Sequence, residues 1–255
     1  MRLSQAQLNV LERCPRQFQH TYLEQLGPTN LEQQERLSSG SRFHLLMQQR
    51  ELGLPIAPLV EEDAQLQRWM SAFTGAASDI LSPNSNSDFR ESEHCRTLQV
   101  QEHLLTVIYD LLIASDRTCQ ILDWKTYPKP QNRNKLGQNW QTLLYLYVLA
   151  ETSEYLPEQI SMTYWFVQTD DKPQSLTFTY SNIQHQQTRQ KLSQLLTKLT
   201  HWLEAYEQGE QFPQVAEGSK TCDYCQFITR CDRYDKEEIS QNWLPNLADI
   251  QELSL

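Results

Sequence analysis

The 255-residue sequence lacks an apolar run long enough to span a bilayer as a helix. Its first residues, Met1–Gln5, lack the apolar core of a secretory signal and instead open an amphipathic helix. A phosphate-binding loop of the Gly-x-x-x-x-Gly-Lys-Ser/Thr type is also missing, which argues against a helicase motor. We therefore expect a cytoplasmic protein that has no membrane partner.

Positive charge is scarce, because 22 Lys and Arg face 32 Asp and Glu, for a formal net charge of -10. This excludes a protein that coats nucleic acid by bulk attraction, since such binding depends on neutralising phosphates. It leaves room for a local basic groove, and Lys125, Lys129, Arg133 and Lys135 fall close together in the chain. An ordinary solvated loop would explain the same cluster equally well.

Six cysteines without a secretory signal indicate reduced thiols and metal ligands rather than disulfides. One lies near the start of the chain and three near its end, in a Cys-x-x-Cys-x5-Cys run: Cys14, Cys222, Cys225 and Cys231. Four thiolates suit a closed zinc site as well as an iron–sulfur cluster. We expect Cys95 and Cys119, the remaining two, to be small buried apolar residues.

Hydrophobic periodicity divides the chain into helices and strands. It predicts helices over about 4–26, around Gly40–His44, and over 61–81, 135–151 and 183–208, and strands near 92–101, 103–114, 118–125, 160–168 and 175–180. The first three strands read as an antiparallel meander, and Ser82–Asp88 is the clearest loop. We expect one α/β unit over 1–255: a helical region over 1–81, a mixed-sheet core over 89–208, and a cysteine segment with an acidic tail over 209–255.

Two carboxylates on neighbouring predicted strands are candidates for a metal site. Asp110 follows Val107–Tyr109, and Asp123 follows the apolar pair Ile121–Leu122. Because a strand alternates its faces, Asp123 and Lys125 point the same way. Oxygen ligands suit Mg²⁺, and a nearby lysine reaches the water or phosphate that the ion activates. A cross-sheet ion pair would explain the Asp-x-Lys tripeptide alone.

Further motifs stand in an informative order along the chain. They are the box Cys14–Phe18, the box Gly40–His44, Asp123-Trp124-Lys125, Gln141-x-x-x-Tyr145 and the trailing cysteines. In this order they resemble the PD-(D/E)XK nuclease superfamily, specifically its RecB-like branch with an iron–sulfur cluster. Members of that branch include the CRISPR-associated RecB-like exonucleases and the AddB nuclease domain. The resemblance implies a restriction-endonuclease-like fold, with the cysteine segment closing onto the first helix.

The resemblance also implies a role for each site residue. His44, Asp110, Asp123 and the Trp124 carbonyl would hold Mg²⁺ or Mn²⁺, and Lys125 would orient water or stabilise charge. Gln141 and Tyr145 would position DNA, and Cys14, Cys222, Cys225 and Cys231 would hold a [4Fe–4S] cluster, with Zn²⁺ as the less favoured occupant. Val107 stands where the family often has glycine, and the family's upstream glutamate would be Glu93 or Glu102.

The implied function is a metal-dependent DNA nuclease, an exonuclease acting on single-stranded ends. Its partners would be DNA and the proteins of a repair, recombination or CRISPR complex. The alternative is a non-catalytic DNA-end-binding or scaffold subunit, which the acidic net charge and Val107 favour. It is opposed by the retained residues His44, Asp110, Asp123 and Lys125.

Overall fold

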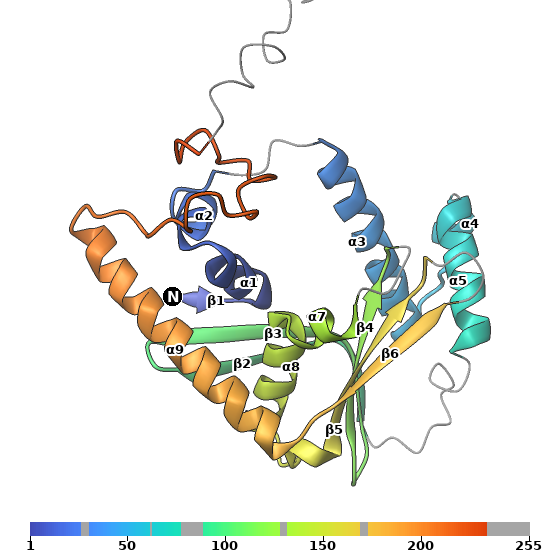
Figure 1. The fold of residues 1–255 in the computed structure, drawn as a ribbon. Helices are drawn as coiled ribbons and strands as arrows, with labels where there is room; N and C mark the ends of the chain where they lie inside the picture. Colours follow the sequence, from blue (N-terminus) through green and yellow to red (C-terminus); the bar gives the residue numbers. More distant parts are fainter. Residues whose placement is uncertain (27–30, 62, 78–88, 128–131, 169–172, 234–255) are drawn as a thin grey trace, which may run out of the picture.

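The structure, a computed structural model, describes residues 1–26, 31–61, 63–77, 89–127, 132–168 and 173–233. Its centre is a six-stranded mixed sheet with helices on both faces, as the sequence predicts (Figure 1). The strands are β1 (Arg2–Leu3), β2 (Phe89–Val100), β3 (His103–Ala114), β4 (Cys119–Lys125), β5 (Ile160–Phe166) and β6 (Gln174–Thr179). The loop Ser82–Asp88, Lys129 and the acidic tail lie outside the described residues.

The long strand β3 organises the sheet. It pairs with β2 in a long antiparallel hairpin, interrupted only at Glu93 and Asp110, which confirms the predicted meander. Along its other edge, β1 pairs in parallel at Leu104 and Leu105, whereas β4 pairs antiparallel from Leu111 to Ala114. The sheet then continues through β5, parallel to β4, to β6. The middle of β3 therefore has a ladder partner on one side alone.

Two apolar cores lie on opposite faces of the sheet, because neighbouring strand residues point to opposite sides. Ile121 packs with α8 (Trp140–Glu151) and α9 (Asn182–Glu207) in the first core. Leu122 and Trp124 pack with α3 (Leu31–Glu51) and α5 (Ala64–Ala76) in the second. The other helical segments are α1 (Gln5–Arg13), α2 (Pro15–Phe18), the π-helical turn η1 (Gln19–Leu23), α4 (Ala57–Glu61), α7 (Arg133–Gly137) and the 3₁₀ turn η2 (Pro157–Gln159).

Two predicted helices are interrupted. The one expected over 4–26 breaks at Cys14, whose extended backbone (φ -160°, ψ 109°) separates α1 from α2. Pro15 explains this break, because proline cannot continue a helix but is well suited to start one. The helix expected over 135–151 is split into α7 and α8, and the Asn139 side chain caps α8 by accepting a hydrogen bond from the Gln141 amide.

The C-terminal cysteine segment folds back onto the first helices, as expected (Figure 1). The Arg16 amide donates to the Pro213 carbonyl at 3.1 Å, and the Phe212 amide donates to Gln19 Oε1 at 2.7 Å. Phe212 also stacks on Phe18, with ring centroids 6.2 Å apart. These contacts join segments almost 200 residues apart in the sequence into one lobe.

Of the two remaining cysteines, Cys119 is buried as expected, but Cys95 is exposed, which makes that prediction wrong. Its position on β2 directs the side chain away from the first core. None of the helices in the described ranges is long and apolar enough to cross a membrane.

Candidate active site

The candidate site lies where β3 and β4 separate. Their antiparallel pairing ends at Leu111 and Leu122, beyond which the last residues of β4 keep only their pairing with β5, which runs along the whole of β4. At this fork, Asp110 Oδ2 accepts a hydrogen bond from the Trp124 amide at 2.6 Å. The Asp110 carboxylate therefore takes the place of the backbone carbonyl that would accept this hydrogen bond if the β3–β4 pairing continued. It lies at the opening between the two strands.

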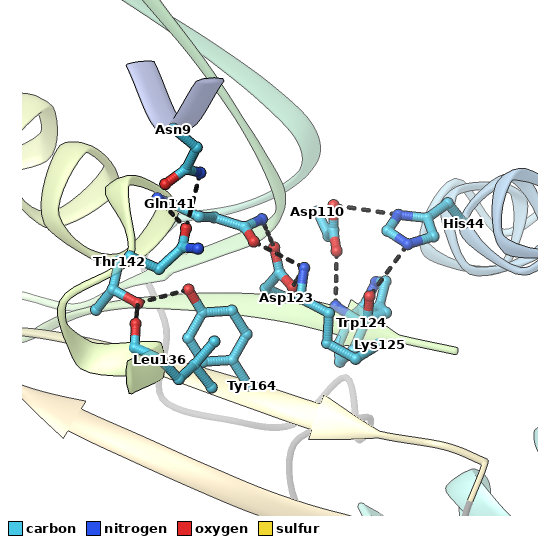
Figure 2. Close-up of polar contacts among 11 residues, drawn as sticks. Asn9, His44, Asp110, Asp123, Trp124, Lys125, Leu136, Gln141, Thr142 and Tyr164 are labelled. Atoms are coloured by element: carbon cyan, nitrogen blue, oxygen red, sulfur yellow. Dashed lines mark hydrogen bonds and ion pairs between the residues drawn. The ribbon is translucent and has the colours of Figure 1, made fainter. Parts of the chain in front are cut away.

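His44 reaches the same fork from α3 (Figure 2). Its Nδ1 lies 3.2 Å from Asp110 Oδ1, and its Nε2 lies 3.1 Å from the Trp124 carbonyl oxygen. Burial lowers the pKa of His44, but the hydrogen bond and charge of Asp110 outweigh burial and raise it. Since both ring nitrogens face acceptors, the metal-free arrangement suits an imidazolium, and the ring must release a proton before it can bind a cation.

Glu93 completes this group from β2. It lies between Ser92, which pairs with Leu111, and His94, which pairs with Tyr109, and so faces Asp110 across the hairpin. One ligand atom each from His44, Glu93 and Asp110 lie within 4.8 Å of one another. Burial, followed by the charge of Asp110, raises the pKa of Glu93.

The backbone at Glu93 is unusual for a strand. Its φ is 52°, in the left-handed region that non-glycine residues seldom adopt and that costs on the order of 1–3 kcal/mol. On β3, opposite Glu93, Tyr109 and Leu112 both pack in the first core. In a regular strand, residues three apart would point to opposite faces, so the alternation of side chains is shifted by one residue beside Asp110. Both strands thus depart from ideal geometry where the two carboxylates meet.

Asp123 and Lys125 lie on the α8 side of the fork. They form an ion pair of 2.5 Å between Oδ1 and Nζ, so the expectation that they share a face is met. Gln141, in the first turn of α8, donates from Nε2 to Asp123 Oδ2 at 2.6 Å and accepts from Lys125 Nζ at 2.8 Å (Figure 2). Asp123 is only 1% exposed, so these two partners replace water.

The pKa values of Asp123 and Lys125 are both shifted from their ordinary values. Burial raises the pKa of Asp123 to about 6, against the opposing charge of Lys125. Burial lowers the pKa of Lys125, but the charges of Asp123 and Asp110 outweigh it and raise the value overall. The lysine therefore stays a cation beside the carboxylates, available to meet a negatively charged ligand.

Tyr145 lies one turn after Gln141 on α8, and its side chain is buried. Its ring meets that of Tyr109 edge-on, with centroids 5.2 Å apart, and its carbonyl accepts a hydrogen bond from the Tyr109 hydroxyl at 3.0 Å. Burial raises the pKa of Tyr145, so its hydroxyl stays protonated. Tyr145 thus lies buried one turn along α8 from the amide that holds the Asp123–Lys125 pair.

The donor set at the fork fits a divalent cation. His44, Glu93 and Asp110 supply one nitrogen and two carboxylates, and the Trp124 carbonyl and Asp123 lie beside them. Oxygen donors suit Mg²⁺, and an added imidazole suits Mn²⁺ as well. Within the part of the chain that the structure describes, this is the one group of three or more His, Cys, Asp or Glu residues that meets the 4.8 Å spacing.

The four cysteines of the predicted cluster line one small pocket. Cys14 enters it from the break between α1 and α2, and Cys222, Cys225 and Cys231 enter from the C-terminal segment. Tight turns position the latter three, since the Cys225 amide donates to the Cys222 carbonyl at 3.0 Å. Burial raises the thiol pKa values of Cys225 and Cys231, and the neighbouring cysteines raise them further.

The chain belongs to the PD-(D/E)XK nuclease superfamily, whose sequence profile matches residues 2–232. The mixed sheet with helices on both faces is the restriction-endonuclease-like fold of that superfamily. The predicted family and fold class are thereby confirmed.

Among solved structures, the chain is similar to that of a "putative exonuclease" from Eubacterium rectale, with a TM-score of 0.55 and 10% identity. That alignment covers 94% of this chain and 93% of the other. It is also similar to the crystal structure of SSO0001, with a TM-score of 0.40, 15% identity, and coverage of 92% and 87%. No curated protein matches the chain.

The sequence offers two candidates, Glu93 and Glu102, for the upstream glutamate that the superfamily often carries. The structure brings Glu93 into the fork and leaves Glu102 exposed in the turn of the β2–β3 hairpin. The hairpin register is the signal that separates them, because only Glu93 lies opposite Asp110. Of the basic cluster, Lys125 lies in the site, Arg133 donates to the Thr177 carbonyl and covers the Phe178 ring, and Lys129 lies outside the described residues.

Proposed function

We propose that this protein is a divalent-metal-dependent DNA nuclease, an exonuclease that hydrolyses phosphodiester bonds at single-stranded DNA ends. The observation that carries the proposal is the convergence of His44, Glu93 and Asp110 within 4.8 Å, beside the buried Asp123–Lys125 pair. Membership of a nuclease superfamily supports the reaction class. In this proposal residues 1–255 act as one nuclease unit, in repair, recombination or CRISPR-type processing.

Each residue at the fork has a distinct part in this proposal. His44, Glu93 and Asp110 hold Mg²⁺ or Mn²⁺, together with Asp123 and the Trp124 carbonyl. When bound, the cation neutralises phosphate charge and lowers the pKa of an attacking water. Lys125 directs its ammonium at the scissile phosphate and stabilises the charge that develops there. Gln141 holds Lys125 and Asp123 in register, and Tyr145 fixes Gln141 from behind.

For the second metal centre we propose a [4Fe–4S] cluster on Cys14, Cys222, Cys225 and Cys231. What supports a shared centre is that all four cysteines line one pocket. Four thiolates suit a closed tetrahedral zinc site as well, and the resemblance to the RecB-like branch favours the iron–sulfur cluster. Iron and sulfide analysis of anaerobically purified protein tests this proposal, and stoichiometric zinc in colourless protein would replace it.

The nuclease proposal is tested with end-labelled single-stranded and duplex DNA, incubated with Mg²⁺ or Mn²⁺. We expect metal-dependent shortening of single strands by the wild type, loss of shortening in Glu93→Gln, and normal shortening in the matched control Glu102→Gln. The product ladder also gives the polarity of cleavage. A folded, cluster-loaded protein that binds DNA ends without cutting them would refute the nuclease and leave the scaffold function.

A further inference from the structure

The long β2–β3 hairpin has one face that the first core covers and one that stays open. Leu98 and Val100 of β2 and Leu105 and Val107 of β3 pack toward the core. The alternate residues point the other way, in the facing pairs Cys95 with Ile108, Thr97 with Thr106, and Gln99 with Leu104. Cys95, Thr97 and Gln99 are exposed, and Ile108 is 45% exposed, which is high for an isoleucine in the middle of a sheet.

This open surface, here called the hairpin face, comprises Arg2, Cys95, Thr97, Gln99, Thr106 and Ile108. It is continuous with the candidate active site, because the next facing pair along the same two strands is Glu93 and Asp110. From Asp110 to Leu104 the face runs for about 20 Å, at a rise of about 3.4 Å per residue. A polymer whose reacting group lies at the two carboxylates would therefore extend directly onto the hairpin face.

The chemistry of the hairpin face differs from that of a duplex-binding surface. It holds a single cation, Arg2, whose Nε donates to Thr106 Oγ1 at 2.8 Å. Duplex DNA presents mainly its phosphates, and one arginine neutralises little of that charge. Next to the carboxylates lie apolar Ile108 and the Cys95 thiol, followed by hydroxyl and amide groups. Such groups suit the unpaired bases and sugars of a single strand.

We infer that the hairpin face binds the single-stranded DNA segment next to the scissile phosphodiester. This inference rests on the proposed nuclease function and adds the surface that selects single strands over duplexes. The base nearest the scissile phosphate contacts Ile108 and Cys95, and Arg2 meets a phosphate farther along the strand. The hairpin face selects single strands over duplexes because bases that are paired in a duplex cannot turn toward it.

Exposed Cys95 provides a binding test that needs no catalysis. The rate at which a maleimide labels Cys95 is measured by mass spectrometry of its peptide, without added divalent metal, and with either a short single strand or its duplex. We expect saturating single-stranded DNA to slow labelling roughly tenfold and duplex DNA to leave it unchanged. Unchanged labelling while fluorescence anisotropy shows a bound single strand would overturn the inference.

Opposite charges at Ile108 provide the second test. Ile108→Glu should weaken the Kd for single-stranded DNA roughly tenfold, and Ile108→Arg should strengthen it, because each charge lies beside the bound strand. Ile183→Glu, a substitution of a 73%-exposed isoleucine at the start of α9, is the matched control and should have no effect. Equal weakening by both Ile108 variants, in proteins whose melting curves match the wild type, would refute the inference.

A small phosphodiester separates this inference from the nuclease proposal. Bis(para-nitrophenyl) phosphate reaches the carboxylates but is too short for the hairpin face. We expect Ile108→Glu to lose a much larger fraction of its activity on single-stranded DNA than on this small substrate. If the wild type cleaves both substrates and Ile108→Glu also cleaves both normally, the hairpin-face inference fails alone. If the wild type cleaves neither, the nuclease proposal fails and this inference with it.

Discussion

Replacing Gln141 by leucine isolates the one neutral side chain that joins the two buried charges of the site. The amide donates to Asp123 at 2.6 Å and accepts from Lys125 at 2.8 Å. Leucine has a similar volume but no polar atom, so packing on α8 is largely kept. The expected effect is a less stable protein in which Lys125 is no longer held in place.

The magnitude follows from how easily water can replace each lost bond. Asp123 is 1% exposed, so its lost charged hydrogen bond should cost about 2 kcal/mol. The Lys125 side chain is 15% exposed and can regain part of its bond from water, so about 1 kcal/mol is expected there. The sum of about 3 kcal/mol corresponds to a fall of about 6–12 °C in Tm for a chain of this size.

Thermal and urea denaturation of the wild type and of Gln141→Leu, followed by circular dichroism, measure this cost. Gln190→Leu, on the exposed side of α9, is the matched control and should stay close to the wild type. In an Asp123→Asn background the cost should fall to about 1 kcal/mol, because the buried charge is gone. If Gln141→Leu is as stable as the wild type, the amide does not hold the buried pair.

Three further predictions address the metal, pH and the cysteine lobe. Mn²⁺ at a hundredfold excess over its Kd should stabilise the protein by about 2.7 kcal/mol in a thermal-shift assay, and Glu93→Gln, but not Glu102→Gln, should abolish the shift. Burial lowers the pKa of His103 below 6.5, so the unfolded state binds more protons than the folded state. The free energy of unfolding should therefore fall as the pH drops below 6.5. Urea titrations should show a smaller fall for His103→Gln. Cys14→Ser should remove the visible absorption of the proposed cluster and lower Tm by several degrees, because that cluster would close a loop of roughly 200 residues; an unchanged melting curve would argue against a metal centre that joins Cys14 to the C-terminal cysteines.

Local patterns explain why the strands were predictable. Alternation and the turn at Ser115–Arg117 predict β3 and β4 to within about a residue at each end. The two-residue strand β1 has no such signal, because its only partner is about 100 residues away. The break at Cys14 was visible in Pro15, but the continuing apolar pattern favoured one long helix.

The candidate site was partly predictable for a different reason. The order of motifs pointed to His44, Asp110 and Asp123, and their roles stay predictions. Which glutamate joins them depends on strand register and on a positive φ at Glu93, and neither is encoded in the residue type. The i,i+4 pattern correctly placed Gln141 and Tyr145 near each other, but their depth in the protein depends on packing against Tyr109.

The lobe that joins Cys14 to the C-terminal segment also sets a schedule for synthesis. At about 5–20 residues per second, the ribosome needs roughly 10–40 s after making Cys14 to complete the last of its three partner cysteines. Over this interval β3 and α8, which share the first core with Leu8 and Leu11, are made long before the cysteine segment is complete. The proposed cluster on Cys14 would therefore be assembled last, after the rest of the first core has been synthesised.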